Sequence, residues 1–157
     1  MDGLQTTTGE KLKIEEVLER AGKYVGPTSG VSMLPMLKTG RDSVVILKKT
    51  ARLAPYDVAL YRREDKYVLH RVLSVTETGY IIRGDNCYAD ENVPEGAVIG
   101  VLTEFFRGDK HVVCTDEKYL KYAKRRVKNY PVRRFFKKIE RKLKGAAKRL
   151  LGYHGQK

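Results

Sequence analysis

The sequence is poor in residues that build disulfide frameworks, metal clusters and phosphate-binding loops. It has two cysteines in 157 residues, Cys87 and Cys114, which are too few for a disulfide framework and are not spaced as a Cys-x-x-Cys pair. His111 and His154 have no ligand-type neighbours at metal spacing, so we expect no metal site. Glycine-rich nucleotide-binding motifs are also missing. We therefore expect no cofactor.

Long apolar runs are missing as well. The longest stretch without a charged side chain covers residues 24–37 and is interrupted by glycine and proline. A membrane-spanning helix needs about 20 mostly apolar residues, so none is predicted. The opening residues, MDGLQTTTGEKLKIEE, lack the basic start and apolar run of a secretory signal. We therefore expect a protein that is cytoplasmic or peripherally bound to a membrane.

Charge is distributed very unevenly along the chain. Lys and Arg number 32 against 19 Asp and Glu, a formal net charge of +13. Residues 1–115 contain 16 basic and 16 acidic residues, so the whole excess lies in residues 116–157. The length suits a single core. We predict a neutral globular domain over residues 1–115 and a basic tail over residues 116–157.

Hydrophobic periodicity predicts a mainly β fold with a short helix before it. Residues 8–21 show helical spacing of apolar side chains, with a capping-box pattern at Thr7 and Glu10 and a stop at Gly22. Six later segments are short, rich in Val, Ile, Leu and Tyr, and bounded by turn residues. These predicted strands cover residues 43–47, 57–61, 67–75, 80–83, 97–106 and 111–114. Together they predict a compact, mostly antiparallel sheet.

The tail is predicted to form two helices that meet near Asn129. The first covers residues 116–128, with Asp116 placed as its cap and Leu120, Ala123 and Val127 as its apolar stripe. The second starts at Pro131 and is a basic amphipathic helix of about six turns. Its candidate membrane- or anion-binding residues are Arg133, Arg134, Lys137, Lys138, Arg141, Lys142, Lys148 and Arg149.

Three partners suit this basic helix. A helix with a wide apolar face and a Lys and Arg face can lie on an anionic membrane surface, which we rank first. Docking on the globular domain or on a partner protein ranks second. Nucleic acid ranks third, because phosphate contacts do not require an apolar face.

Three segments contain residues with catalytic potential. In SGVSMLPML, Ser32 is either an ordinary loop residue or a nucleophile presented by a turn. In YVLHRVLSV, His70 lies on an apolar strand face, where it is either a buried core histidine or a general base. In IIRGDNCYADEN, the carboxylates of Asp85, Asp90 and Glu91 either form turns or include one that orients His70.

In chain order, the segments SGVSMLP, GRDSVVI, APYDVALY, YVLHRV, IIRGDN and AVIGVL resemble the successive boxes of the type I signal peptidase family. The resemblance covers residues 27–102. It is similar to the endoplasmic-reticulum and archaeal branch, in which His precedes Arg in the third box, where the bacterial branch has Lys. It implies a signal-peptidase-like β fold and the cleavage of a leader or signal peptide bound as an added strand.

The resemblance also implies roles for individual residues. Ser32 would be the nucleophile, His70 the general base and Asp85 a supporting acid. The second acid of the family falls on Asp90 or Glu91, and the sequence leaves both open. The oxyanion or the substrate would be bound near Ser29 and Met33.

The leading hypothesis is therefore a serine endopeptidase that acts on a peptide or protein substrate. Members of the family normally have an N-terminal membrane helix, which is not predicted here, so the basic tail is expected to provide any membrane contact. One alternative is a self-cleaving protease of the SOS-repressor type, although such proteins use a lysine base and carry a DNA-binding domain. The other is a non-catalytic adaptor whose tail binds anionic membrane or nucleic acid.

Overall fold

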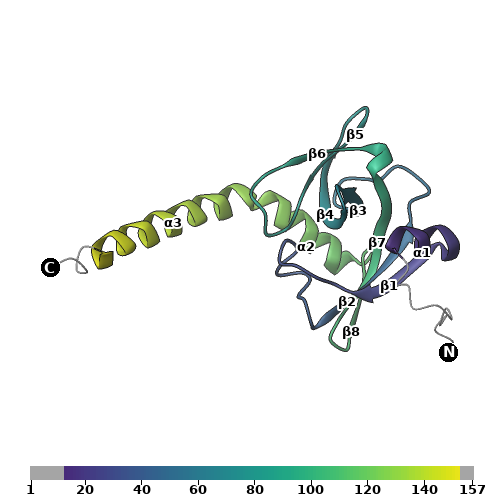
Figure 1. Cartoon of the computed structure of the whole chain (residues 1–157), viewed down its shortest axis with the longest axis horizontal. Helices are drawn as coiled ribbons and strands as arrows, with labels where there is room; N and C mark the ends of the chain where they lie inside the picture. The colour runs from purple at the N-terminus through teal and green to yellow at the C-terminus, as the bar shows by residue number, and fades with distance from the viewer. Residues whose placement is uncertain (1–12, 153–157) are drawn as a thin grey trace.

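The structure, a computed structural model, describes residues 13–152, except for the side chains of residues 141 and 148–152. Within that range the chain forms one antiparallel sheet of eight strands and three α-helices (Figure 1). The helices are α1 (Ile14–Ala21), α2 (Glu117–Lys128) and α3 (Tyr130–Gly152). The strands are β1 (Lys23–Pro27), β2 (Asp42–Lys48), β3 (Val58–Arg63), β4 (Lys66–Val75), β5 (Gly79–Arg83), β6 (Glu91–Pro94), β7 (Val98–Arg107) and β8 (Lys110–Val113). A short 3-10 helix (Glu95–Ala97) precedes β7.

The curled sheet confirms the predicted mainly β architecture. Its strands run in the order β1-β2-β7-β3-β4-β5-β6, and β8 pairs with β7. All six predicted strands are present, but β1 and β6 were not predicted. β1 contains glycine and proline and has no fully buried residue, while β6 has one buried side chain, Val93. Such short segments give too few alternating apolar positions to be recognised as strands.

The first helix begins later than predicted. Lys13 is extended, with φ −65° and ψ 145°, so α1 starts at Ile14 instead of residue 8. The proposed cap at Thr7 and Glu10 lies outside the described residues. The predicted stop is confirmed: Gly22 adopts a left-handed φ of 68° and donates its N–H to the carbonyl of Leu18.

Helix α2 packs against the sheet and is part of the globular body. Tyr119 and Ala123 are 6% and 0% exposed and belong to a hydrophobic core that also contains Leu18, Met36 and Phe105. Leu120 of the predicted apolar stripe is 38% exposed. Asp116 occupies the N-cap position, but its side chain makes no capping hydrogen bond. The change in charge near residue 116 therefore does not mark the end of the packed domain.

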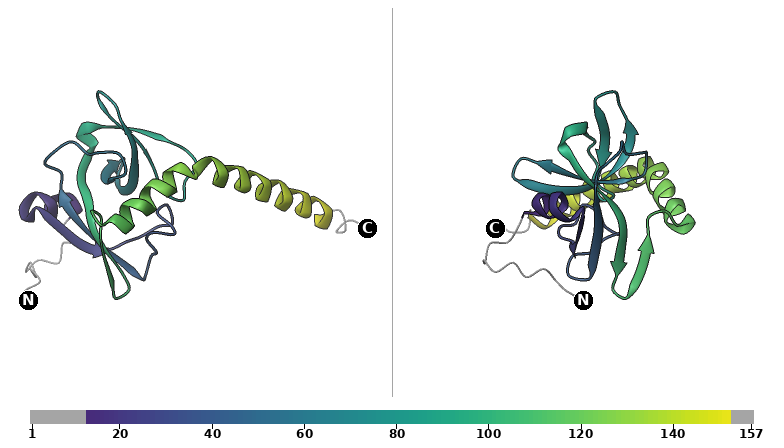
Figure 2. Two further views of the ribbon diagram at one scale, coloured as in Figure 1. Left: turned by 180° about the vertical axis from the view of Figure 1, so that it is seen from behind. Right: turned by 90° about the vertical axis from the view of Figure 1, so that its right-hand side faces the viewer.

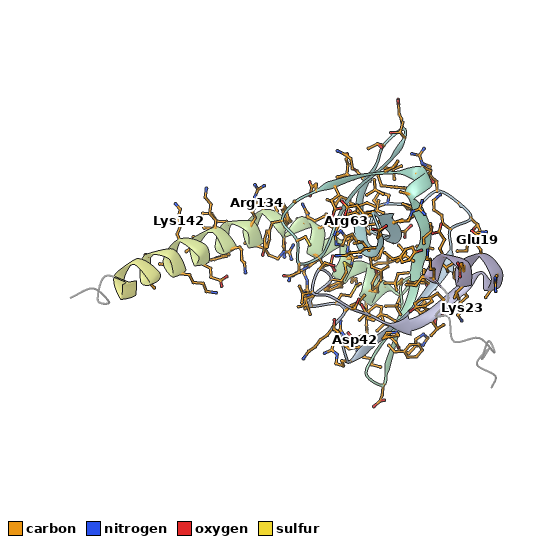
Figure 3. All side chains as sticks on the ribbon, in the orientation of Figure 1. Glu19, Lys23, Asp42, Arg63, Arg134 and Lys142 are labelled. Carbon is orange, nitrogen blue, oxygen red and sulfur yellow. The ribbon has the colours of Figure 1, made fainter. Side chains whose placement is uncertain are left out.

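Helix α3 leaves the body and extends away from it, as the views of Figures 1 and 2 agree. Pro131 lies in its first turn, as predicted. Four of its apolar side chains are more than half exposed: Val132, Phe135, Phe136 and Leu143. Arg134 and Lys142 project from it clear of the sheet (Figure 3). Among the described residues, no helix has the length and apolarity needed to cross a bilayer.

Candidate active site

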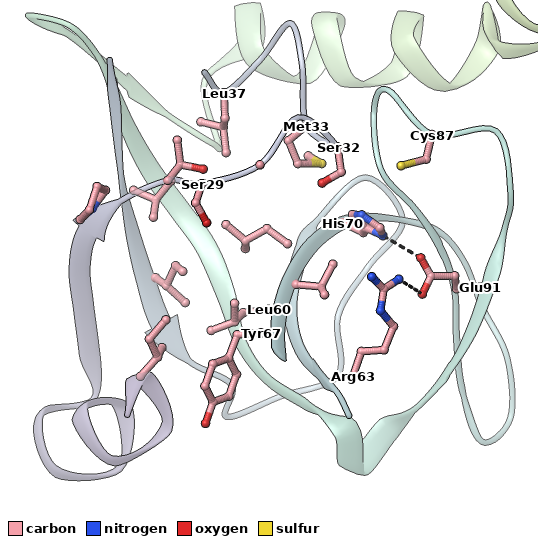
Figure 4. Close-up of a pocket in the computed structure, with 18 of the residues that line it drawn as sticks. Ser29, Ser32, Met33, Leu37, Leu60, Arg63, Tyr67, His70, Cys87 and Glu91 are labelled. Carbon is pink, nitrogen blue, oxygen red and sulfur yellow. Dashed lines mark hydrogen bonds and ion pairs between the residues drawn. The ribbon is translucent and has the colours of Figure 1, made fainter. Parts of the chain in front are cut away.

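The candidate site lies in a pocket of about 500 Å³ between the loop before β2, strand β4 and the loop after β5 (Figure 4). One end of the pocket holds polar and reactive side chains from segments far apart in sequence: Ser32, His70, Cys87 and Glu91. The rest is mainly apolar and includes Val44, Ile46, Leu60 and Leu69. This arrangement suits an extended peptide with an apolar side chain beside a reactive centre.

His70 is buried and faces a carboxylate. Its side chain is 4% exposed, and Nδ1 lies 3.0 Å from Oε1 of Glu91. The hydroxyl of Tyr61 lies 3.1 Å from Nδ1 and donates to Oε2 of Glu91 at 2.9 Å. Arg63 donates to the same oxygen at 3.0 Å. The carboxylate of Glu91 is thus fixed in place by three side chains.

These contacts set the protonation states of the pair. Burial lowers the pKa of His70 below its ordinary value of 6.5, and the negative charge of Glu91 opposes this only in part. Burial by itself would raise the pKa of Glu91, but hydrogen bonds from Tyr61 and Arg63 outweigh it and hold that pKa below the usual range. At neutral pH the carboxylate is charged and the imidazole neutral. With Nδ1–H directed at Glu91, Nε2 is left as a proton acceptor.

Gly84 brings the Nε2 edge of the histidine close to the segment that carries Ser32. A Cβ at Gly84 would lie 2.9 Å from Nε2 of His70, 2.8 Å from the carbonyl oxygen of Ser32 and 2.8 Å from Sγ of Cys87. The three groups therefore surround Gly84, and Figure 4 shows their side chains at the same end of the pocket. Within the described residues, no hydrogen bond joins the Ser32 hydroxyl to His70. Such bonds are often long before substrate binds.

The Ser32 turn is tied to the loop after β5. Asn86 donates its main-chain N–H to the carbonyl of Ser32 at 2.7 Å and its side-chain amide to the carbonyl of Val31 at 3.1 Å. Ser29 is exposed at the edge of the pocket, whereas Met33 is 5% exposed and packs into the core. Met33 therefore anchors the turn and presents little surface to a substrate.

Asp85, one of the three acids that could orient His70, forms no hydrogen bond or ion pair with it. Its carboxylate receives two hydrogen bonds from the buried guanidinium of Arg71, both at 2.8 Å, and one from Tyr122 at 3.1 Å. Asp85 is 4% exposed and Arg71 is 1% exposed. Asp85 therefore neutralises a buried cation beneath the site.

The structure shows which of the neighbouring acids Asp90 and Glu91 contacts His70. Asp90 forms an ion pair with Arg83 at 2.7 Å and its side chain is 52% exposed. Glu91, the first residue of β6, is the acid that meets His70. Of the two acids that the sequence left open, Glu91 is therefore the one placed to orient the histidine, and Asp90 is not.

Sequence reasoning missed the residues that hold Glu91. Tyr61 and Arg63 alternate on β3, which places them on one face of the strand, but only the pairing of Ala59 with His70 brings that face to the histidine. The residues next to Cys87 in the sequence include no base, yet the thiol lies on the Nε2 side of His70. Burial raises the pKa of its thiol, so Cys87 is protonated at neutral pH.

The predicted anion-binding residues of the tail divide into three groups. Arg133 is half-buried and donates to the carbonyl of Asp85 at 2.7 Å, so it fastens the helix to the body and is not free for an external anion. Exposed cations of this set are Arg134, Lys137, Lys138 and Lys142. The side chains of Arg141, Lys148 and Arg149 lie outside the described residues.

Comparisons with protein-family models, curated proteins and solved structures found no match to this chain. Within the part of the chain that the structure describes, no group of three potential metal-ligating side chains is found.

Proposed function

We propose that this protein is a serine endopeptidase of the signal-peptidase type that removes a leader or signal segment from a peptide or protein. The observation that supports it most directly is the environment of His70. Nδ1 of His70 meets an ionised carboxylate, and its Nε2 lies near the same Gly84 position as the carbonyl oxygen of Ser32. His70 and Ser32 both line a pocket of peptide size. A histidine that only fills the core does not require this combination of features.

In the proposed reaction, Oγ of Ser32 attacks the scissile carbonyl while Nε2 of His70 accepts the hydroxyl proton. Glu91 stabilises the imidazolium, which then gives the proton to the leaving amine. Water, deprotonated by the same imidazole, hydrolyses the acyl-enzyme and regenerates the serine. Among the described residues, the main-chain N–H groups of Ser32 and Met33 have no main-chain acceptor, and in the proposed reaction they bind the oxyanion.

The test is cleavage of leader- or signal-peptide-like substrates, followed by mass spectrometry of the products. We expect the chain to cleave them at one bond and the Ser32→Ala variant to be slower by about a thousandfold or more. Ser74→Ala, which removes an exposed serine hydroxyl of β4, is the matched control and should retain full activity. Equal cleavage by the chain and Ser32→Ala, or no cleavage across a broad panel, contradicts the proposal.

A further inference from the structure

A second groove begins where the catalytic pocket ends. Tyr88 and Ala89, in the loop before β6, line the catalytic pocket and also an open groove of about 1300 Å³ against the first turns of α3. The two cavities therefore adjoin at this loop. A peptide chain that extends from the pocket over Tyr88 enters the groove.

The first turn of α3 is fastened to this loop, so the groove has a defined shape. The hydroxyl of Tyr130 donates to the carbonyl of Tyr88 at 2.6 Å. The guanidinium of Arg83 lies 3.2 Å from the centre of the Tyr130 ring, while Arg133 binds the carbonyl of Asp85. These contacts keep α3 in one place relative to the site.

The helix side of the groove is strongly basic. Four cations line it: Arg134, Lys137, Lys138 and Lys142. Of the described carboxylates, Glu140 pairs with Lys137, and none lies within 4.0 Å of a charged nitrogen of the other three. Exposed cations in a concave surface attract an anionic partner and repel a cationic one.

The position of these cations on α3 favours a peptide over a bilayer. At 100° per residue, Arg134 and Lys138 project on the opposite side of the helix from Val132, Phe136 and Leu143. A membrane that takes up these three side chains lies away from Arg134 and Lys138, whereas the exposed ring of Phe135 lines the groove itself. A peptide that passes from the catalytic pocket over Tyr88 into the groove lies beside these two cations.

We infer that this groove binds an acidic segment of the peptide substrate, one that lies beyond the residues held in the catalytic pocket. The inference rests on the proposed peptidase function for the source of the peptide. It adds a specificity that the reactive centre does not provide: among leader peptides, those with Asp or Glu on the groove side bind more tightly.

The test measures binding separately from cleavage. Fluorescence anisotropy with the full-length Ser32→Ala protein compares labelled leader-like peptides that differ only in a flanking segment, which is Glu-rich, neutral or Lys-rich, placed at either end. For one of the two placements, we expect the Kd of the Glu-rich peptide to be lower than that of the neutral peptide by about tenfold or more. The preference should weaken as salt is added.

Charge-reversal variants locate the site. Arg134→Glu with Lys138→Glu should abolish the preference for the Glu-rich peptide and favour the Lys-rich one. The matched control, Lys124→Glu with Lys128→Glu, makes the same charge change at the same spacing on exposed positions of α2 outside the groove, and should retain the preference. Equal loss in both variants, or no preference in the parent, overturns the inference. So does binding to phosphatidylserine vesicles that needs Arg134 and Lys138 without any preference among the peptides.

Failure of the two proposals can be told apart. If no substrate is cleaved but the groove still selects the Glu-rich peptide, the peptidase proposal fails and the acidic-segment site stands. If peptides are cleaved with equal kcat/KM whatever their flanking charge, the site proposal alone is overturned.

Discussion

At the scale of single residues, the protein places a neutral histidine beside an ionised carboxylate in a buried setting. Burial favours the neutral imidazole, and the Tyr61 and Arg63 hydrogen bonds favour the charged form of Glu91. A base must be unprotonated before it can accept a proton from Ser32, so these pKa directions match the proposed role of His70 at neutral pH. A lysine in the same position would need a much larger pKa shift.

Replacing Glu91 by glutamine should separate its effect on the pKa of His70 from its stabilisation of the imidazolium during the reaction. The negative charge of Glu91 raises the pKa of His70, so its loss lowers that pKa further. We expect the acid limb of the kcat/KM profile to move to lower pH. The maximum rate should fall about 100-fold or more, because the imidazolium loses its stabilising partner.

The measurement is kcat/KM between weakly acidic and alkaline pH. Asp90→Asn is the control, because Asp90 pairs with Arg83 and does not touch the histidine. A Glu91→Gln profile that coincides with that of the parent chain, or identical shifts in the two variants, would show that Glu91 does not act on the base.

At the scale of elements, a buried polar network joins β4, the loop after β5 and α2. Arg71 contributes a bidentate ion pair to Asp85, and its guanidinium also donates to the hydroxyl of Tyr119 at 3.1 Å. Arg126 of α2 donates to the carbonyl of Asp85 at 2.8 Å. The network fixes the loop that carries Cys87 and leads to Glu91. It therefore acts on the site by holding these two residues in position.

Asp85→Ala should therefore destabilise the fold. Removing one partner of a buried ion pair typically costs about 3–5 kcal/mol, because the other charge is left without compensation. We expect a loss of this size in the free energy of unfolding, measured by urea denaturation. The double variant Arg71→Met with Asp85→Leu should recover part of it. A stability equal to that of the parent chain would contradict this structural role.

The same variant tests the corrected site. The charge of Asp85 raises the pKa of His70 less than that of Glu91 does, so the acid limb of folded Asp85→Ala protein should move to lower pH by less than that of Glu91→Gln. A shift like that of Glu91→Gln would instead return Asp85 to the catalytic group.

At the scale of the whole molecule, a globular body formed by the sheet and helices α1 and α2 is joined to the projecting basic helix α3. The junction lies after α2, because Tyr119 and Ala123 fill the core while Val132 and the apolar residues that follow it are exposed. Helix α3 and the candidate active-site pocket adjoin at Tyr88 and Ala89.

Truncation should reveal this junction. A chain ending at Arg133 retains Tyr130 and the contacts of Arg133, so we expect cooperative unfolding with a Tm within a few degrees of the full chain. A chain ending at Asp116 loses the core contacts of α2, and its Tm should fall by about 10 °C or more. Circular dichroism during heating compares the two. Similar Tm values for both truncations would place the boundary at residue 116 after all.

The sequence by itself determined the class of the fold, most strands and the separation of charge. Alternating Val, Ile and Leu residues bounded by turn residues specify strands locally, and the 3.6-residue period of the tail specifies helices. It also singled out Ser32 and His70, because the resemblance depends on the order of short segments along the chain. Each of these properties is encoded in neighbouring residues.

Only the tertiary structure decided which side chains meet. The sequence left Asp90 and Glu91 open as the acid that orients the histidine, but strand pairing and curling of the sheet direct Asp85, Asp90 and Glu91 to Arg71, Arg83 and His70, respectively. Similarly, charge composition assigned α2 to the tail, while burial of its Tyr119 face assigned it to the body. Such contacts join residues distant in sequence, and their energies depend on burial and register, which no local pattern contains.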